Sequence, residues 1–529
     1  MGGEKRLLRG QRRADGRCMT RYRVEERSLS RLLVDQAQAF PERPWVIFDS
    51  RETLTFGAAL DGSRHVAARL EADYSRERGG PRVGLMLRNC PEFLLAVHGA
   101  FLAGGVAFLF DPDLPPRALC TLLERCELHM LLVDAESAPA AHAGLPASGA
   151  PRIVAVGAQW DRWLGNARPQ PLRLPRYDAA ALVIFTSGTT GIPKGVVASH
   201  HYAFQYSAVA SDTLGRNAAD VLTAPLPLFH VGGLHMVAHS ALQVGGRAHL
   251  KCRFSASRYW EEAAADGATQ GALVAEMARM ILARSPSAAE HRMKHNSIGG
   301  LMDCEEFERR YRVKVLWQAY GMTEANPCPA GLTPLGSREH TIGMPMDYIE
   351  YGVVDAEDRL LPPGETGELV LRTAPHFMFE RYLHDEAATR NAFRGGFFHT
   401  GDRMSISPEG LLAFRGRAGE RIRHHGENVD PRAIELAALR YPGVREAAAY
   451  GVPGPLGDDD VKLDVVADPA LDLAALRRAL ADELPKKAVP RYLELQRELP
   501  RTATFRVRKH ILRDRGLTRA EVLDFERGR

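Results

Sequence analysis

The chain has 529 residues with 69 basic and 65 acidic side chains, so its formal net charge is +4. Hydrophobic residues make up 45% and charged residues 25% of the chain, which excludes disorder or low-complexity architecture for most of its length. The small net charge does not favour nucleic-acid binding, and no run of about 18 apolar residues predicts a membrane span. Seven scattered cysteines lack the spacing of a metal site. We therefore expect a soluble, cytoplasmic protein that binds neither nucleic acid nor membrane.

From about Ser28 onward, short apolar runs alternate with amphipathic segments. The pattern predicts a capped helix at 28–40, a strand at 45–50 and a long helix at 56–72. Further apolar runs predict buried strands near 82–89, 106–113, 129–135, 181–186 and 221–229. Buried strands that alternate with helices predict mostly parallel sheets covered on both faces.

After Gly364 the runs become shorter, and an α+β pattern of roughly 100 residues follows a segment rich in arginine and glycine at 415–420. We expect a disordered tail at 1–27, a large domain at 28–415 and a small mobile domain at 416–529. The predicted fold is α/β, with a large N-terminal lobe of mostly parallel sheets flanked by helices and a small α+β C-terminal lid domain.

The segment FTSGTTGIPKG at 185–195 directly follows a predicted buried strand. Its small residues allow backbone N–H groups to approach an anion, its hydroxyls add donors and its lysine adds charge. The residues that we expect around a phosphate are Thr186, Ser187, Gly188, Thr189, Thr190 and Lys194. The segment does not have the glycine spacing of a Walker A loop. A glycine- and threonine-rich loop without a ligand is the alternative.

Five further segments accompany this loop in a fixed order. They are PLPLFHVGGL (225–234), YGMTEANP (320–327), HTGD (399–402), GRAGERIRHHGENVDPRAIE (416–435) and PRTATFRVRK (500–509). Together with TSGTTGIPKG they resemble the motifs of the adenylate-forming superfamily, which contains acyl-CoA ligases, adenylation domains and luciferases. The resemblance spans about residues 28–513 and is strongest to carnitine- or crotonobetaine-type CoA ligases.

The resemblance implies a nucleotide site. Tyr320 and the adjacent Gly321 would contact adenine, and Thr323 would donate to a phosphate oxygen. Glu324 would bind magnesium, which prefers hard oxygen ligands. The alternative for Tyr320 is simple core packing.

Two further residues are expected at the ribose. Asp402 would accept the ribose hydroxyls, and Arg417 would add a donor to the same sugar. The alternative for this pair is a turn cap and a solvated charge.

The resemblance also implies an acyl and thiol site. His230 would act as a gate, although a lone histidine is more often structural, and Gly426 would line the pantetheine tunnel. The implied reaction joins ATP and a carboxylic acid into acyl-AMP, from which the thiol of CoA then displaces AMP. The cofactors expected are the AMP moiety of acyl-AMP or ATP, CoA, and Mg²⁺ where adenylation occurs.

The last motif departs from the family pattern. Phe505–Arg506 stand where the family has Gly-Lys, and the resemblance gives that lysine the task of bridging the carboxylate and the α-phosphate. Arg506 keeps the charge on a larger planar group, so it is not an equivalent replacement. Lys509 is nearby, but three residues of extended chain shift it by about 10 Å and reverse its face.

The leading hypothesis is an acyl-CoA ligase that is strong only in thioester formation, with acyl-AMP supplied by a separate adenylating enzyme in a specialised biosynthetic pathway. The alternatives are a complete two-step ligase, in which Arg506 or Lys509 supports adenylation, and a catalytically inactive nucleotide-binding protein. A luciferase-type oxygenase shares the motifs, although no residue favours it.

Overall fold

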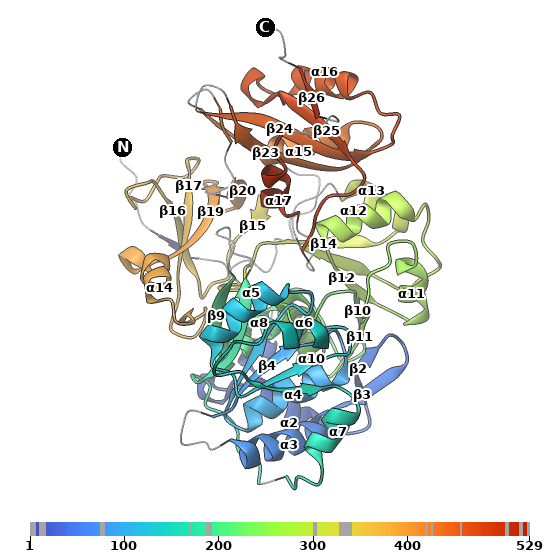
Figure 1. The fold of residues 1–529 in the computed structure, drawn as a ribbon, viewed down its shortest axis with the longest axis vertical. Helices are drawn as coiled ribbons and strands as arrows, with labels where there is room; N and C mark the ends of the chain where they lie inside the picture. Colours follow the sequence, from blue (N-terminus) through green and yellow to red (C-terminus); the bar gives the residue numbers. More distant parts are fainter. Residues whose placement is uncertain are drawn as a thin grey trace.

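Figure 1 shows the computed structural model, in which a large lobe is followed by a smaller C-terminal part at one end of it. The described residues are 7–9, 17–74, 80–169, 171–186, 193–299, 304–326, 341–417, 422–424, 427–454, 458–502, 507–517 and 522–525. Within these residues the large lobe contains two seven-stranded sheets and one six-stranded sheet. A two-stranded and a four-stranded sheet belong to the C-terminal part.

The first seven-stranded sheet carries the strand that leads into the predicted phosphate loop. Its spatial order is β18 (Arg381–Tyr382), β9 (Lys194–Ser199), β8 (Ala180–Thr186), β5 (Val106–Leu109), β4 (Arg82–Met86), β6 (Met130–Val133) and β7 (Arg152–Ala155). The strands from β8 to β7 are parallel, whereas β9 and β18 add antiparallel pairs. Residues 181–184 of β8 are buried, as expected for a parallel strand covered on both faces.

The second seven-stranded sheet is parallel except at one edge, where β2 and β3 form an antiparallel pair. Its spatial order is β14 (Lys314–Ala319), β13 (His295–Gly299), β12 (Gln270–Val274), β10 (Val221–Ala224), β11 (Arg247–Leu250), β2 (Pro44–Phe48) and β3 (Glu52–Thr55). The two sheets share one hydrophobic core, which includes Trp45, Phe93 and Phe204.

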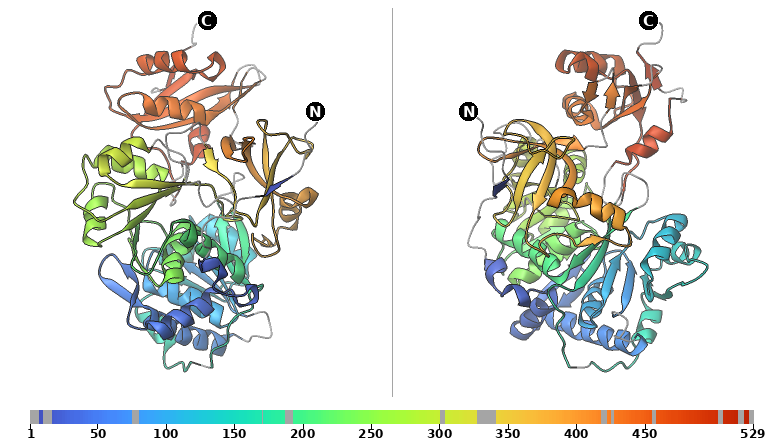
Figure 2. Two further views of the ribbon diagram at one scale, coloured as in Figure 1. Left: turned by 180° about the vertical axis from the view of Figure 1, so that it is seen from behind. Right: turned by 90° about the vertical axis from the view of Figure 1, so that its left-hand side faces the viewer.

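The helices of the large lobe pack against these sheets (Figures 1 and 2). They are α1 (Arg17–Thr20), α2 (Leu29–Ala39), α3 (Phe56–Asp73), α4 (Pro91–Leu102), α5 (Pro116–Cys126), α6 (Ala138–Ala143), α7 (Ala158–Leu164), α8 (His200–Thr213), α9 (Val231–Gly233), the π-helix Leu234–Ala238, α10 (His239–Val244), α11 (Tyr259–Ala265), α12 (Ala275–Arg284), α13 (Glu305–Tyr311) and α14 (Glu386–Ala392). The predicted cap of the first long helix is present, because Ser28 Oγ accepts a 3.2 Å hydrogen bond from the backbone N–H of Arg31. None of the helices in the described ranges has the length and apolar character needed to cross a membrane.

The six-stranded sheet is antiparallel throughout and differs from the expectation of mostly parallel sheets. Its spatial order is β1 (Leu8–Arg9), β16 (Glu350–Val354), β17 (Thr366–Arg372), β19 (Phe398–Ile406), β20 (Leu412–Arg417) and β15 (Thr341–Gly343). The connections β16–β17 and β19–β20 are hairpin loops, whereas β18 and α14 lie in the longer connection between β17 and β19. The change of pattern after Gly364 therefore marks this sheet as well as the C-terminal part.

The C-terminal part combines a β-hairpin, a four-stranded sheet and helices. Its elements are β21 (Ile422–His424), β22 (Glu427–Val429), α15 (Pro431–Arg440), β23 (Val444–Pro453), β24 (Asp459–Ala467), α16 (Leu473–Glu483), β25 (Tyr492–Gln496), α17 (Lys509–Asp514) and β26 (Val522–Asp524). Asp430 caps α15 by accepting from the N–H of Arg432 (2.9 Å), and Pro431 occupies its first turn. The predicted fold class, a large α/β lobe followed by a small α+β domain, is confirmed.

Parts of the segment expected as a disordered tail are placed in the structure. Leu8 and Arg9 pair with Tyr351 and Glu350 of β16. The backbone N–H groups of Cys18 and Met19 donate to the Asp212 carboxylate at 2.9 and 3.0 Å. These contacts are made to residues more than 190 positions away, which explains why local composition suggested a tail.

Candidate active site

The hairpin of β8 and β9 presents both ends of the predicted phosphate loop. Thr186 and Lys194 are paired across it, and Thr186 Oγ1 lies 3.5 Å from the carbonyl oxygen of Lys194. The predicted loop residues Ser187, Gly188, Thr189 and Thr190 lie outside the described residues. Because Thr186 and Lys194 lie opposite each other, the segment between them begins and ends at the same end of β8 and β9.

A lysine, a tyrosine and a buried carboxylate follow one another next to this hairpin. Lys194 Nζ lies 4.8 Å from the centre of the Tyr382 ring, a distance at which a cation is attracted to the ring face. The Tyr382 hydroxyl donates a 2.9 Å hydrogen bond to Glu324 Oε1. Burial raises the pKa of Glu324, although the bond from Tyr382 opposes this shift. Tyr382 was not among the predicted site residues.

Glu324 belongs to a turn at 320–326 that the large lobe holds in place. The Tyr202 hydroxyl on α8 donates to the carbonyl oxygen of Thr323 (3.0 Å), and the N–H of Phe379 donates to that of Glu324 (2.9 Å). A Cβ atom at Gly321 would lie 3.1 Å from Asn326 Oδ1, so the turn is closely packed at this position. The predicted residues Gly321, Thr323 and Glu324 thus lie on one closely packed turn.

The carboxylate of Asp402 joins three segments that are distant in the sequence. Tyr320 Oη donates to Asp402 Oδ2 at 2.7 Å, and Arg417 Nε donates to Asp402 Oδ1 at 2.9 Å. Asp402 and Arg417 face each other in the pairing of β19 with β20. Asp402 is only 2% exposed, so its charge is held by these two donors in a nearly dry environment. The structure thus brings together Tyr320, Asp402 and Arg417, three of the residues that the sequence predicts for an adenosine site.

The predicted gate residue has a structural role of its own. His230 precedes α9, and its Nδ1 accepts a 3.1 Å hydrogen bond from the N–H of Gly232. This contact fixes the ring at the start of the helical segment that continues into the π-helix Leu234–Ala238. The described contacts do not join His230 to Glu324 or Asp402.

The structure describes residues 500–502 and 507–509 of the last predicted motif. Arg506 lies outside the described residues, as does Gly426. Lys509, the residue considered as a replacement, begins α17, and its Nζ lies 2.6 Å from Glu435 Oε1 on α15.

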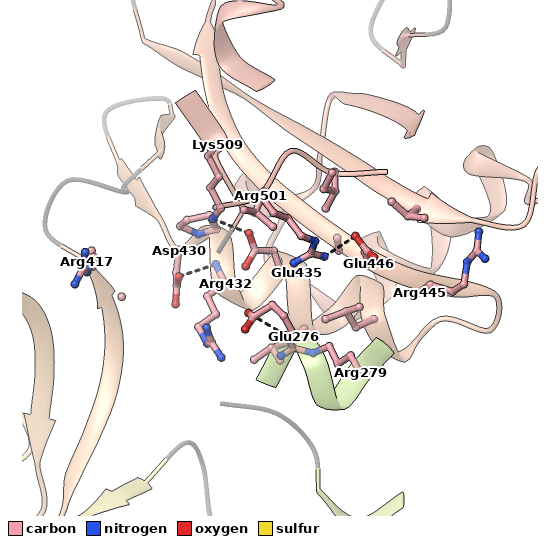
Figure 3. A pocket seen from close by; sticks show the side chains of 18 of the residues that line it. Glu276, Arg279, Arg417, Asp430, Arg432, Glu435, Arg445, Glu446, Arg501 and Lys509 are labelled. Carbon is pink, nitrogen blue, oxygen red and sulfur yellow. Dashed lines mark hydrogen bonds and ion pairs between the residues drawn. The ribbon is translucent and has the colours of Figure 1, made fainter. Parts of the chain in front are cut away.

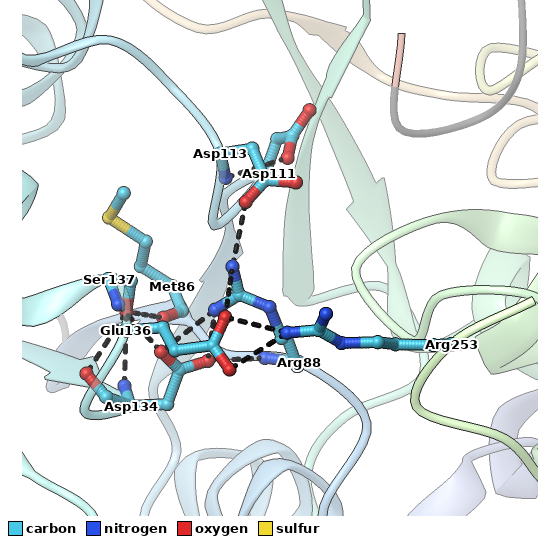
Figure 4. Close-up of polar contacts among 8 residues, drawn as sticks. All are labelled: Met86, Arg88, Asp111, Asp113, Asp134, Glu136, Ser137 and Arg253. Atoms are coloured by element: carbon cyan, nitrogen blue, oxygen red, sulfur yellow. Dashed lines mark hydrogen bonds and ion pairs between the residues drawn. The ribbon is translucent and has the colours of Figure 1, made fainter.

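The neighbouring Arg508 acts on an acidic side chain of the large lobe. Burial raises the pKa of Asp111, and the charge of Arg508 opposes the shift. Figure 4 shows Asp111 beside Asp113, whose Oδ1 accepts from Arg88 at 2.8 Å. Asp111 follows β5, which pairs with β8. The last motif therefore lies close to the sheet edge from which the phosphate loop emerges.

A cavity of about 710 Å³ lies between α12, α15 and the ends of β20 and the last motif. Its labelled walls in Figure 3 include Glu276 and Arg279 of α12, Arg432 and Glu435 of α15, and Lys509. Among the predicted nucleotide residues that the structure describes, Arg417 alone lines this cavity. The cavity is therefore the space between the large lobe and the C-terminal part.

The donor set around Glu324 fits a hard divalent cation. Glu324 is 9% exposed, and its Oε1 accepts the hydrogen bond from Tyr382. Its second carboxylate oxygen is a hard ligand of the kind that magnesium prefers. Glu324 would hold magnesium there, next to the hairpin that bears Lys194.

Comparisons with known proteins agree with this geometry. Residues 33–383 match the family model described as AMP-binding enzyme, and residues 433–506 match the AMP-binding enzyme C-terminal domain. A medium/long-chain-fatty-acid–CoA ligase, FadD17 of Mycobacterium marinum, is 31% identical over 82% of this chain and 86% of its own length. A sulfoacetate–CoA ligase of Cupriavidus necator is 30% identical over 91% of this chain and 96% of its own.

A solved structure also resembles this chain in its fold. The O-succinylbenzoate coenzyme A synthetase MenE of Bacillus subtilis, in complex with AMP, is 26% identical with a TM-score of 0.79, covering 93% of this chain and 98% of that one. The first model covers Lys194, Tyr320, Glu324 and Tyr382, whereas Asp402 and Arg417 lie between the two matched ranges. This chain belongs to the family of AMP-binding enzymes.

Proposed function

We propose that this protein is an AMP-forming acyl-CoA ligase whose thioester-forming step is faster than its adenylation step. The ligase activity is supported by two relatives that are named CoA ligases and that align with more than four fifths of this chain. It is also supported by the site, where the turn 320–326 carries the carboxylate of Glu324 and, through Tyr320, contacts the carboxylate of Asp402.

The two carboxylates suit two different tasks. Asp402 is held by Tyr320 and Arg417 and would accept the two ribose hydroxyls of the AMP moiety in both half-reactions. Magnesium would neutralise charge on the phosphates during adenylation, and Glu324 would hold it. Lys194 and the loop after Thr186 would bind the phosphate oxygens through charge and N–H donors.

The slow adenylation rests on the last motif. In acyl-AMP formation, negative charge gathers between the carboxylate and the α-phosphate, so a compact cation at a fixed point lowers the barrier. Removing one such donor costs about 10²–10³ in rate in enzymes where it has been measured. Arg506 is larger and planar, and Lys509 is engaged by Glu435 in this structure.

The thioester step uses another part of the C-terminal domain. We propose that residues 416–529 rotate as a lid against the large domain 28–415, which would bring the segment with Gly426 to the pantetheine of CoA and move the last motif away. His230 would border the acyl and thiol sites. The identity of residue 506 then matters little for the attack of the thiol on acyl-AMP.

The partners of such an enzyme are a carboxylic acid or its acyl-AMP, CoA, and a separate adenylating enzyme in a specialised biosynthetic pathway. The relatives' names cover fatty acids, sulfoacetate and 2-succinylbenzoate, so they do not narrow the acid. The likeness to carnitine-type ligases stays a prediction. Because these relatives are named as ligases, a complete two-step ligase is the second candidate.

The test supplies synthetic acyl adenylates of aliphatic and aromatic acids together with CoA, and measures CoA consumption. We expect turnover with at least one adenylate and loss of it in Asp402→Ala, while Lys509→Met serves as a matched control in the lid. An enzyme that consumes CoA only when ATP and free acid are present would contradict the proposal. No CoA consumption under either condition would favour the inactive nucleotide-binding protein.

A further inference from the structure

The strand that carries Asp402 departs from regular pairing just before this residue. Glu368 of β17 faces Arg403 of β19, whereas Val370 faces His399, so the single residue Leu369 stands opposite three residues of β19. These residues, 400–402, form a bulge in which Gly401 has a φ of +71°, a conformation that favours glycine. A bulge re-aims the side chains next to it, and here it precedes the carboxylate that joins Tyr320 and Arg417.

The Glu368 side chain contacts both Gly401 in this bulge and His399 just before it. Glu368 Oε1 accepts a 2.9 Å hydrogen bond from the N–H of Gly401. Glu368 Oε2 lies 3.0 Å from His399 Nδ1 and accepts a 2.8 Å bond from Arg394. Burial would raise the pKa of Glu368, but the bonds from His399 and Gly401 lower it below its ordinary value. The carboxylate is therefore ionised and engaged on both oxygens.

The backbone continues this arrangement to Asp402. Thr400 Oγ1 donates to the carbonyl oxygen of Leu369 at 2.9 Å and accepts from the N–H of Asp402 at 3.2 Å. Residues 368 and 369 of β17 thus fix three consecutive residues of β19. The contacts of Glu368 are with the peptide that leads into Asp402, not with Asp402 itself.

We propose that Glu368 is a positioning residue, which fixes the bulge 400–402 and thereby aims the Asp402 carboxylate at the ribose hydroxyls of the AMP moiety. This inference rests on the proposed function, because it assumes that Asp402 binds ribose. Glu368 acts through Gly401 and does not touch the nucleotide.

The same carboxylate also belongs to a group with the spacing of metal ligands. Asp358, Glu368 and His399 have ligand atoms within 4.8 Å of one another. However, Arg394 bonds Asp358 Oδ2 at 3.0 Å in addition to Glu368. The Arg394 guanidinium already supplies the positive charge between the carboxylates of Asp358 and Glu368. We therefore infer that the cluster stabilises the bulge.

The experiment compares the affinity of the full-length protein for AMP and for 2′,3′-dideoxy-AMP by calorimetry. The dissociation constant for 2′,3′-dideoxy-AMP divided by that for AMP measures how well the ribose hydroxyls are recognised, independently of overall folding. We expect Glu368→Ala to reduce this ratio by roughly tenfold, which corresponds to about 1.4 kcal/mol, mainly through weaker AMP binding. Glu368→Gln, which keeps an acceptor for the Gly401 N–H, should restore part of the ratio.

Two further variants make the outcomes distinct. Glu350→Ala removes the ion pair with Arg372 on the neighbouring strands β16 and β17 and should leave the ratio unchanged. Asp402→Ala should abolish discrimination. If both Glu368 variants keep the ratio of the parent protein while Asp402→Ala loses it, the positioning role of Glu368 alone is overturned. A parent protein that binds both nucleotides equally overturns the ribose role of Asp402 and this inference with it.

Discussion

Lys509 and Glu435 form an ion pair of 2.6 Å that ties the start of α17 to α15. Glu435 Oε1 also accepts a 3.0 Å hydrogen bond from the N–H of Ala449 on β23, so the carboxylate is fixed from two directions. Both side chains are mostly buried, at 21% and 16% exposure. A lysine held in this way contributes to the internal structure of the C-terminal domain.

We therefore expect Lys509→Met to leave both half-reactions within about threefold of the parent, while lowering the free energy of unfolding by about 1 kcal/mol. The measurements are acyl-AMP and acyl-CoA formation and urea denaturation of the same variant. The matched change is Arg506→Met, which should remove the remaining adenylation. Loss of acyl-AMP formation in Lys509→Met with a normal denaturation curve would show that Lys509 replaces the missing lysine.

A second prediction separates the two carboxylates. Asp402→Ala should weaken the binding of both ATP and acyl-AMP, because the ribose is present in each. Glu324→Ala should weaken Mg²⁺-dependent ATP chemistry and spare the binding of acyl-AMP, which carries no pyrophosphate. Calorimetry with a non-hydrolysable acyl-AMP analogue decides the matter, and equal losses in the two variants would refute this division of roles.

A third prediction concerns the pH dependence set by Tyr382. Its hydroxyl stabilises the ionised form of Glu324, whose pKa burial raises, and only the ionised form can hold a cation. Tyr382→Phe removes a bond worth about 1.5–3 kcal/mol to a charged group, so the pKa of Glu324 should rise further. The acidic limb of ATP-dependent acyl-AMP formation should move to higher pH, whereas thioester formation from acyl-AMP should keep its profile. An unchanged acidic limb would speak against Glu324 as the metal ligand.

A fourth prediction follows from three buried histidines of the large lobe, His98, His235 and His239. His98 Nε2 lies 3.2 Å from His239 Nε2, and His239 Nδ1 lies 3.0 Å from His235 Nδ1. Burial lowers the pKa of His98 and of His235 to about 3. Since the unfolded chain binds these protons near pH 6.5 and the folded chain does not, stability is present above pH 6.5 and falls below it. Each such histidine contributes a slope of about 1.4 kcal/mol per pH unit.

Urea denaturation at pH 7.5 and 5.5 checks this dependence. His98→Phe should lose less stability between the two pH values than the parent does, whereas His142→Gln on exposed α6 should lose as much as the parent. The same loss in His98→Phe as in the parent would mean that the imidazole cluster takes up protons in the folded state.

The sequence predicted the parts of the site that lie in continuous motifs. The phosphate loop was placed after a buried strand because apolar residues 181–184 precede it, and β8 has this character. Asp402 and Arg417 were expected at one sugar, and the pairing of β19 with β20 sets them opposite each other. Tyr320 was expected to present its ring, whereas the structure adds its hydroxyl as a donor to Asp402.

Contacts between distant segments were not predictable from local patterns. Tyr382 sits on the two-residue strand β18 and reaches Glu324, 58 positions earlier, only because β18 pairs with β9. Glu368 occurs in an ordinary strand pattern, and its role depends on a register shift that no spacing encodes. The six-stranded sheet begins with Leu8, which pairs with Tyr351, so its first strand has no local signal at all.

We propose that thioester formation is faster than adenylation in this protein. The direct measurement is single-turnover formation of acyl-AMP from ATP and acid, and of acyl-CoA from acyl-AMP and CoA, using the same acid. We predict that the parent forms acyl-CoA about 10²–10³ times faster than acyl-AMP, and that Phe505→Gly with Arg506→Lys raises the adenylation rate alone. Equal rates of the two steps in the parent protein would contradict the proposed order of rates and identify a complete two-step ligase.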